Sequence, residues 1–223
     1  MALANSLVVM AKSPEAGRVK TRLIPPLTGV EAAELYTHFI ADIFSTLEMV
    51  EDIKIYLALL SVGIEEPLRI DIPEGVEVIE QSGSNLGERL YNVTKALFDL
   101  GHERVAIIGS DSPDIPPEYV SDAFLRLKPG SSKVVLGPAE DGGYYLIAMN
   151  HLDERPFRGI NWSTPTVLDE TVACLAGEVE LLKPWYDIDE PKDILRLKGS
   201  KRAANSAAYI LDNDIFNRCK DYI

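Results

Sequence analysis

The feature that most constrains this chain is a short apolar run that ends in an acidic turn containing proline. Residues 104–108 read Arg-Val-Ala-Ile-Ile, a composition typical of a strand buried within a sheet. Gly109 frees the backbone after this run, and Pro113 prevents the strand from continuing. We therefore expect Asp111 at the carboxyl end of a core strand, the edge at which open α/β sheets bind their ligands. The alternative is a strand-ending turn in which Asp111 only caps the next helix.

Strand-like and helix-like patterns alternate along the rest of the chain. Apolar or alternating runs predict strands at 7–11, 53–60, 76–79, 133–136, 144–148, 178–182 and 185–188. Apolar residues at helical spacing predict helices at 29–50, 86–100 and 117–127, and from residue 163 or 164 to 176. This alternation indicates an α/β protein with a mostly parallel sheet and helices on both faces.

The domain organisation follows from length and from the lack of dividing segments. No repeat, low-complexity tract or linker interrupts the 223 residues, a length that suits one α/β domain. We therefore expect a single domain over residues 1–223. Its last part predicts a C-terminal helix at about 201–223, which packs against the domain or against a second subunit of a homodimer.

Charge and residue usage exclude several classes of function. The formal net charge of −13 disfavours nucleic acid or an anionic membrane as the main partner. The sequence has neither a run long enough to span a bilayer nor a signal-type N-terminus. Cys174 and Cys219 show no metal spacing, and the three histidines are scattered, so we expect a cytoplasmic protein without a zinc site or a histidine-based triad.

A basic loop follows the first predicted strand. Residues 12–22 contain a glycine, a proline and four cations, Lys12, Arg18, Lys20 and Arg22. Glycine permits close approach of a ligand to the backbone, and lysine and arginine form charge-assisted hydrogen bonds with phosphate. The loop matches neither the Walker A pattern nor the dinucleotide-binding glycine fingerprint. It is interpreted as a phosphate-binding loop, with a solvated basic turn as the alternative.

Two further acidic turns occur downstream of Asp111. Asp141 precedes a pair of glycines between two predicted strands, which favours a tight hairpin or, equally, a place where a ligand approaches the backbone. Asp187 and Asp189 follow the last predicted strand. Asp189 alternatively caps the helix that begins at Pro191.

These loops are expected to gather along one edge of the sheet, because all follow strands of a mostly parallel sheet. Two carboxylates about 4 Å apart repel each other by roughly 4 kcal/mol at an effective dielectric constant of about 20. A divalent cation removes this conflict, and oxygen-only ligands favour Mg²⁺ or Mn²⁺ over zinc. Cations on one side and a carboxylate-held metal on the other would cradle a nucleotide diphosphate or triphosphate.

Six short stretches also resemble a known family. They lie at 12–23, 83–89, 109–113, 141–146, 162–164 and 187–189. In this order they are similar to the motifs of a bacterial family of candidate nucleotide-diphospho-sugar transferases (DUF2064-type) with the glycosyltransferase-A fold. More distantly, the chain looks like 2-phospholactate guanylyltransferase and the molybdenum-cofactor nucleotidyltransferases, although it lacks the G-G-x-x-x-R-M-G opening of the latter.

The resemblance implies a three-layer α/β/α domain with a mostly parallel mixed sheet and a nucleotide bound over its N-terminal half. It implies that Asp111 is the chief metal ligand, and thus catalytic, and that Asp187 or Asp189 is the second ligand. Asp141 is the candidate catalytic base by its position alone. The residues implied to contact phosphate are Lys12, Arg18, Lys20 and Arg22. Arg89, in the first turn of the helix at 86–100, either reaches the nucleotide or forms a surface ion pair, and its sequence position favours the ion pair. Those implied to face the acceptor are Asp141, Gly142, Gly143 and Trp162, and Tyr144 is added because it follows the two glycines.

Three functions are compatible with this pattern. The first is a metal-dependent transferase that moves a sugar from a nucleotide-diphosphate donor to an unknown small acceptor. The second is a nucleotidyltransferase that joins a nucleoside monophosphate to a phosphorylated metabolite and releases pyrophosphate. The third is a nucleotide-binding domain without catalysis. The four acids argue against it, because binding alone does not require so many mutually repelling carboxylates.

Overall fold

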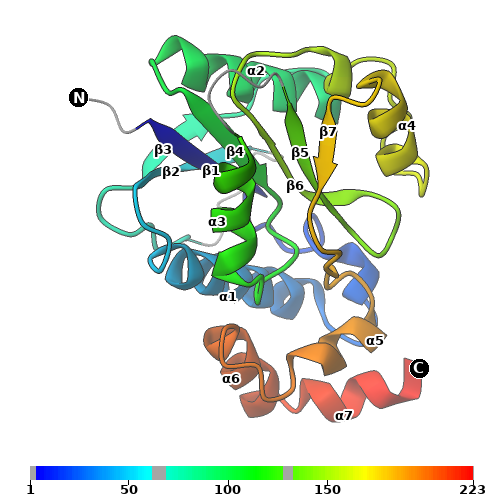
Figure 1. Cartoon of the computed structure of the whole chain (residues 1–223). Helices are drawn as coiled ribbons and strands as arrows, with labels where there is room; N and C mark the ends of the chain where they lie inside the picture. Colours follow the sequence, from blue (N-terminus) through cyan, green and yellow to red (C-terminus); the bar gives the residue numbers. More distant parts are fainter. Residues whose placement is uncertain (1–3, 62–68, 128–132, 223) are drawn as a thin grey trace.

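A seven-stranded mixed sheet forms the centre of the protein, in the order β3-β2-β1-β4-β6-β5-β7. The computed structural model describes residues 4–61, 69–127 and 133–222 (Figure 1). The strand β6 is antiparallel to both of its neighbours, and the other pairings are parallel. The mostly parallel α/β sheet predicted from the sequence is therefore confirmed. The strands are β1 Asn5–Lys12, β2 Ile53–Leu60, β3 Glu77–Glu80, β4 Arg104–Ile108, β5 Val134–Pro138, β6 Tyr144–Met149 and β7 Val179–Leu181.

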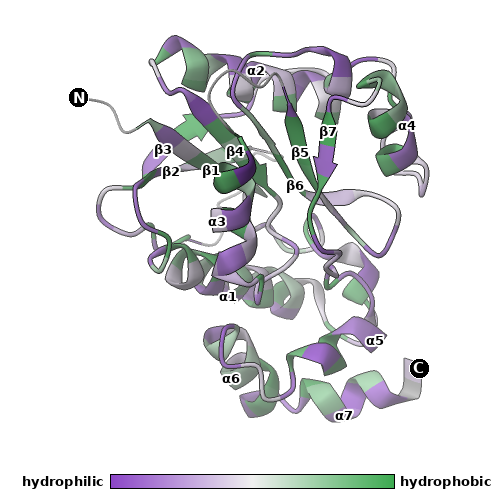
Figure 2. Cartoon of the chain, in the orientation of Figure 1, coloured by the Kyte–Doolittle hydropathy of each residue, from purple (hydrophilic) through white to green (hydrophobic). Residues whose placement is uncertain are grey.

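Helices cover both faces of the sheet and divide the core in two. Successive residues of β1 point to opposite faces, so that Leu7 and Val9 belong to one cluster and Val8 to the other. The first cluster includes α1 (Gly29–Leu47) and α3 (Pro117–Arg126), and the second includes α2 (Leu86–Asp99) and α4 (Val167–Cys174). Figure 2 shows apolar residues concentrated along the strands between these layers. This is the expected three-layer α/β/α arrangement.

Local hydrogen bonds fix where the helices begin. Thr28 and Glu31 form a capping box at the start of α1, and the Asn85 side chain accepts from the backbone N–H of Glu88 at the start of α2. The helix α4 begins later than the predicted cap at residue 163 or 164. Ser163 has a left-handed backbone (φ 63°) and the Thr164 hydroxyl donates to the Asn161 carbonyl at 2.7 Å, so a turn precedes the helix.

Two predictions for the C-terminal third are wrong. Residues 185–188 form no strand, because only Trp185 bridges to Ala139 before the chain turns toward β4. The predicted helix over 201–223, whose last residue lies outside the described part, is two helices, α6 (Ala204–Asp212) and α7 (Ile215–Cys219). A left-handed backbone at Asp214 (φ 52°) separates them. None of the helices in the described ranges is long and apolar enough to cross a membrane.

The helix α6 packs against α1, on the side of α1 that faces away from the sheet (Figure 1). Its first turn is held by Asp42 of α1, which is 1% exposed. The Asp42 carboxylate accepts from the backbone and side chain of Asn205 and from the backbone and hydroxyl of Ser206, at 2.5–2.9 Å. These four hydrogen bonds compensate the cost of burying the charge.

The helix α7 is joined to the start of α1 by an ion pair. Both terminal nitrogens of Arg218 donate to the Glu31 carboxylate, at 2.6 and 2.9 Å, and one also donates to the Pro26 carbonyl. These hydrogen bonds lower the pKa of Glu31 to about 2. A carboxyl whose pKa is lowered on folding stabilises the folded state above its ordinary pKa, and this contribution disappears as the pH falls through the lowered value.

Arg218→Ala is therefore expected to lower the free energy of unfolding by about 1–2 kcal/mol near neutral pH, since the pair is partly exposed. The difference from the wild type should shrink as the pH falls from 4.5 toward 2. Urea unfolding at neutral pH and at about pH 3 measures both effects. Lys220→Ala, which removes a nearby exposed cation, is the matched control. A difference that does not depend on pH would contradict the role given to Glu31.

Candidate functional site

The predicted site loops meet at the carboxyl edge of the central strands. Because β1 and β4 are parallel neighbours, the loops that follow them leave the sheet side by side. A third segment, residues 187–190, joins them after β7. The backbone N–H of Ile188 donates to the Asp111 carbonyl at 2.8 Å, which fixes this segment against the turn after β4.

Lys20 lies at the centre of this meeting point, with only 3% of its side chain exposed. Its ammonium contacts the Asp111 carboxylate and donates to Asp189 Oδ1 at 3.1 Å and to the Ile188 carbonyl at 2.7 Å. Burial by itself would lower the pKa of Lys20, but attraction to Asp111 and Asp189 outweighs it and raises that pKa. Lys20 is therefore an ammonium ion at neutral pH. It was expected to contact phosphate, whereas in this structure it bridges two of the acids.

The backbone of Lys20 is itself unusual. It has a left-handed conformation (φ 47°), which is uncommon outside glycine. Such conformations cost free energy and persist where surrounding contacts impose them. Here the ammonium of the same residue is held by Asp111, Asp189 and Ile188.

Asp187 lies beside these groups and has a strongly altered acidity. Its Oδ1 accepts from the Ser112 hydroxyl at 2.7 Å. Burial raises the pKa of Asp187 to about 7, and repulsion from Asp111, Asp141 and Asp189 adds to the rise, while the hydrogen bond from Ser112 opposes it. The structure thus brings together the four acids that the sequence singled out. What they bind remains a prediction.

Neither alternative role as a helix cap holds for these acids. At the start of α5 (Pro191–Ile194), the Asp193 carboxylate accepts from the backbone N–H groups of Asp189 and Glu190, so the Asp189 side chain is not the cap. Pro116 occupies the cap position of α3 without any side-chain hydrogen bond, so Asp111 does not cap that helix. Both carboxylates instead face Lys20.

The other cations of the basic loop are exposed. Lys12 and Arg18 face solvent, and 71% of the Arg22 side chain is accessible. Arg22 Nη1 lies 3.8 Å from Asp189 Oδ2. In the part of the chain that the structure describes, Arg89 forms no ion pair, and its Nε is buried without a hydrogen-bond partner. The surface ion pair considered for Arg89 is thus not found among the described residues.

The Asp-Gly-Gly segment is the turn of the β5–β6 hairpin. Gly142 has φ +92°, and a Cβ atom there would lie 2.1 Å from the Pro165 carbonyl oxygen. The glycine is thus required by the approach of another loop as well as by the turn. The Asp141 Oδ1 accepts from the backbone N–H of Gly143 at 2.8 Å and stabilises the turn. The hairpin interpretation is confirmed, and contact of Gly142 and Gly143 with an acceptor remains a prediction.

Tyr144 and Trp162 pack together on the face covered by α2. Their ring centroids are 6.3 Å apart, and the indole lies against Gly87, where a Cβ would be 2.7 Å from Trp162 Nε1. The Tyr144 hydroxyl is buried and has no hydrogen-bond partner within the described ranges. Both residues belong to the core on that face, and no described ion pair or hydrogen bond joins them to the four acids.

Three residues of the site were not recognised from the sequence. Ser112 binds Asp187, and the Tyr36 hydroxyl bonds both Ser110 Oγ (2.6 Å) and the backbone N–H of Lys12 (3.1 Å). Tyr36 thereby joins the ends of β1 and β4. The position of Ser112 directly after Asp111 was an available signal. Tyr36 lies among the apolar residues of its helix, and nothing in that pattern indicates a contact with the site.

The sheet order and its layers place the protein in the class of nucleotide-diphospho-sugar transferase-like α/β folds. The crystal structure of a candidate nucleotide-diphospho-sugar transferase from Desulfovibrio desulfuricans G20 superposes with a TM-score of 0.83 at 31% identity, covering 100% of this chain and 99% of that chain. Residues 44–164 match DUF2064, a family described as "uncharacterized protein conserved in bacteria". The chain belongs to this family.

More distant structures share the fold alone. CMP:2-keto-3-deoxy-manno-octonic acid synthetase complexed with CTP has a TM-score of 0.53 at 13% identity, covering 90% of this chain and 97% of that one. 4-Diphosphocytidyl-2C-methyl-D-erythritol synthase has a TM-score of 0.51 at 12% identity, covering 88% and 98%. No curated protein matches the chain.

Proposed function

We propose that this protein is a metal-dependent transferase that moves a sugar from a nucleotide-diphosphate donor to a small acceptor. The observation that carries the proposal is the convergence of Asp111, Asp141, Asp187 and Asp189 on one sheet edge, beside the loop that bears Lys12 and Arg18. Groups that repel one another are retained where a ligand offsets their charge. The similarity to the Desulfovibrio protein supports the same class of donor.

The chemistry of the acids suits a divalent metal ion. All are carboxylates, the hard oxygen ligands that Mg²⁺ and Mn²⁺ prefer. Among residues 4–61, 69–127 and 133–222, no three acids, histidines or cysteines already form a ligand group. Lys20 instead occupies the space between Asp111 and Asp189. We therefore assign Asp111 together with Asp187 or Asp189 to the metal, with Lys20 moving from the carboxylates toward the phosphates when the donor binds.

In the proposed reaction, the bond between the sugar carbon and the diphosphate oxygen breaks while the acceptor oxygen bonds to the same carbon. The acceptor loses its proton, and the nucleoside diphosphate leaves. A bound divalent cation would offset the negative charge that develops on the departing diphosphate. Asp141 is the proposed base: it is exposed, Gly143 occupies one of its oxygens, and its other oxygen has no hydrogen bond in the described structure.

Lys20→Met tests the movement assigned to Lys20. The variant removes a buried cation that competes with the metal for Asp111 and Asp189, so Mn²⁺ without nucleotide should bind about tenfold more tightly. Binding of nucleotide with Mn²⁺ should weaken. Titration calorimetry measures both. Arg22→Gln, which removes an exposed cation near the same acid, should change Mn²⁺ affinity much less.

A folded Lys20→Met protein whose Mn²⁺ affinity is unchanged or weaker would show that the lysine is a structural counter-ion. Circular dichroism and the unfolding midpoint establish that the variant is folded. Methionine is chosen because its side chain is apolar and flexible, and it can pack against the Phe39 ring beneath the lysine.

The function itself is tested by a thermal-shift screen of nucleoside diphosphates and nucleotide sugars with Mn²⁺, since a ligand that binds only the folded state raises its stability. Stabilising donors are then incubated with candidate acceptors, and release of nucleoside diphosphate is measured. Metal-dependent stabilisation followed by release supports the transferase. Stabilisation without turnover of any donor would favour the non-catalytic nucleotide-binding domain.

Nucleotidyl transfer is the second candidate, because cytidylyl-type synthetases share this fold. It uses the same cationic loop and acids but consumes a nucleoside triphosphate and releases pyrophosphate. A coupled pyrophosphate assay with each triphosphate and a set of phosphorylated acceptors separates the two. Pyrophosphate release would favour this candidate over sugar transfer.

A further inference from the structure

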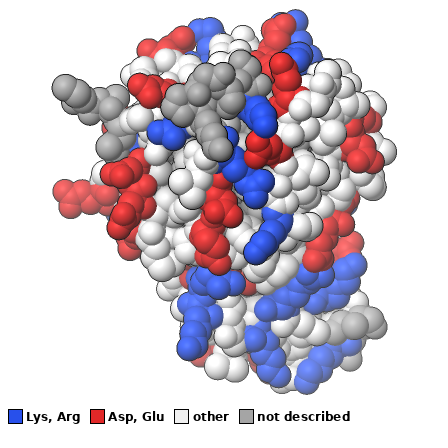
Figure 3. Space-filling view, viewed as in Figure 1, with Lys and Arg blue, Asp and Glu red and all other residues white. Residues whose placement is uncertain are grey.

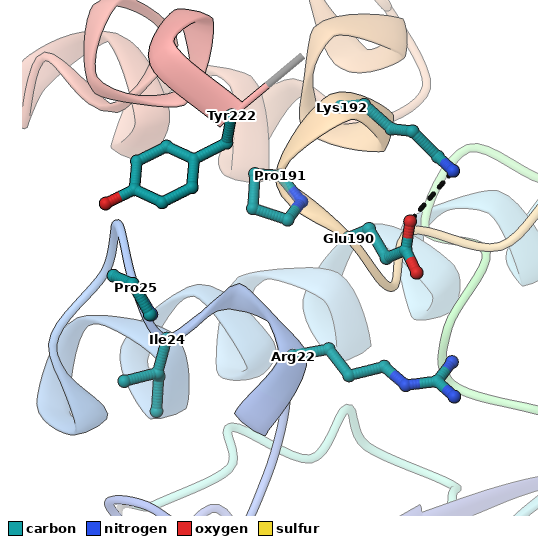
Figure 4. A pocket seen from close by; sticks show the side chains of 7 residues that line it. All are labelled: Arg22, Ile24, Pro25, Glu190, Pro191, Lys192 and Tyr222. Carbon is teal, nitrogen blue, oxygen red and sulfur yellow. Dashed lines mark ion pairs between the residues drawn. The ribbon is translucent and has the colours of Figure 1, made fainter.

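An open pocket of about 300 Å³ lies between the loop after β1, the start of α5 and the C-terminal turn (Figure 4), and its lining residue Arg22 pairs with Asp189 of the acid cluster. Arg22 thus connects the pocket with the acid cluster. Of its lining residues, only Arg22 belongs to the predicted phosphate-binding loop, and none belongs to the predicted acceptor site. The lining residues are Arg22, Ile24, Pro25, Glu190, Pro191, Lys192 and Tyr222.

The lining divides into an apolar wall and a charged rim. Ile24, Pro25, Pro191 and the Tyr222 ring form one side, and Arg22, Glu190 and Lys192 form the other (Figure 4). Lys192 pairs with Glu190 at 2.8 Å, so these two charges largely cancel. The Arg22 guanidinium donates no hydrogen bond within the described ranges. The pocket therefore presents, beside an apolar wall, a guanidinium whose one ion pair in the described structure is the long 3.8 Å contact with Asp189.

The surroundings of the pocket are basic, although the protein is acidic. Residues 191–222 contain seven lysines and arginines against four acids, whereas the whole chain has a net charge of −13. Figure 3 shows Lys and Arg side chains gathered over the lower part of the molecule, where Figure 1 draws α5, α6 and α7. These cations favour small anions over cations on this side of the pocket, whereas Asp189 and Glu190 act in the opposite direction.

We infer that this pocket binds the acceptor, and that the acceptor is a small anion with an apolar or ring-shaped body. Its phosphate or carboxylate would pair with the planar guanidinium of Arg22, and its body would lie against Pro25, Pro191 and Tyr222. The inference rests on the proposed function. It assigns Arg22 to the acceptor side of the site, where this residue contacts Asp189.

Phenyl phosphate, which combines a phosphate with an apolar ring, is the probe. It is titrated into the isotope-labelled full chain without metal or nucleotide, and backbone amide signals are followed by NMR. We expect the largest shifts at residues 22–24, 190, 192 and 222. Arg22→Gln should raise the dissociation constant about tenfold and Tyr222→Ala about threefold. Lys198→Gln, which removes an exposed cation outside the pocket lining, should leave it unchanged.

Benzoate and inorganic phosphate separate the contributions of the ligand. Benzoate binding at the same residues would extend the class to carboxylates, and inorganic phosphate binding as tightly as phenyl phosphate would overturn the role of the apolar wall. Shifts centred on residues 12–20, or an Arg22→Gln protein that binds equally well, would overturn the inference. Because no nucleotide is present in this titration, a lack of phenyl phosphate binding would not contradict the proposed transferase. Conversely, a lack of binding by every nucleotide donor would not contradict binding of a small anion in this pocket.

Discussion

Asp111→Asn is expected to weaken metal-dependent nucleotide binding by at least about a hundredfold. The carboxylate lies at the end of β4, faces the centre of the acid cluster and is the assigned chief metal ligand. Asparagine keeps its shape but removes the negative charge and one anionic oxygen. Calorimetry with Mn²⁺ and the nucleotide that stabilises the wild type most strongly measures the loss. Lys20 retains Asp189 and the Ile188 carbonyl as partners, so the domain should stay folded.

Asp212→Asn, at an exposed position of α6, is the matched control and should bind as the wild type does. The comparison has one decisive outcome. If the folded Asp111→Asn protein binds nucleotide and Mn²⁺ with unchanged affinity, the acid cluster is not the metal site. The proposed function would then lose its main support.

Asp187→Asn is expected to stabilise the metal-free protein at alkaline pH, by up to about 4 kcal/mol. The Asp187 carboxyl keeps its proton up to about pH 7 in the folded state, whereas its ordinary pKa is 3.8. A carboxyl with a raised pKa leaves stability intact below its ordinary pKa and lowers it progressively as the pH rises through the raised value. Asparagine does not ionise, so the gain should be negligible near pH 4 and complete above about pH 8.

Urea unfolding in the presence of a chelator, across this pH range, measures the gain. Asp212→Asn should show no comparable rise with pH, because that side chain is exposed and far less desolvated. A gain that is equal at acid and alkaline pH would mean that Asp187 is not held in its protonated form. If Asp187 rather than Asp189 is the second metal ligand, added Mn²⁺ should reverse the benefit, because the metal ion stabilises the wild type more than the variant that lacks this carboxylate.

Much of the fold followed from local patterns, because buried strands and amphipathic helices leave periodic signals. Residues 104–108 and the turn at Asp111 were placed correctly for this reason. The antiparallel direction of β6 was not specified by its own sequence, which is as apolar as that of a parallel strand. The break between α6 and α7 was missed because a left-handed residue at position 214 leaves no apolar signal.

The site was predictable in place but not in detail. The rule that parallel strands share a carboxyl edge brought distant acids together correctly. It could not show that Lys20 turns inward to the acids while Arg18 and Arg22 face solvent, because loop spacing does not fix side-chain direction. Nor could it show that the Asp193 carboxylate accepts the hydrogen bond at the start of α5, so that the Asp189 side chain is available to bind Lys20.

The bonds from Lys20 to Ile188 and Asp189 connect residues 168 and 169 positions apart in the chain. Contacts of such long separation close a large loop, which costs more conformational entropy than a contact between neighbours in the chain. A nascent or truncated polypeptide that stops before residue 187 lacks half of the cluster, however well its first strands have paired. Ligand binding therefore reports whether the whole chain has folded. A polypeptide truncated within residues 187–190 should lose ligand binding while keeping most of its secondary structure.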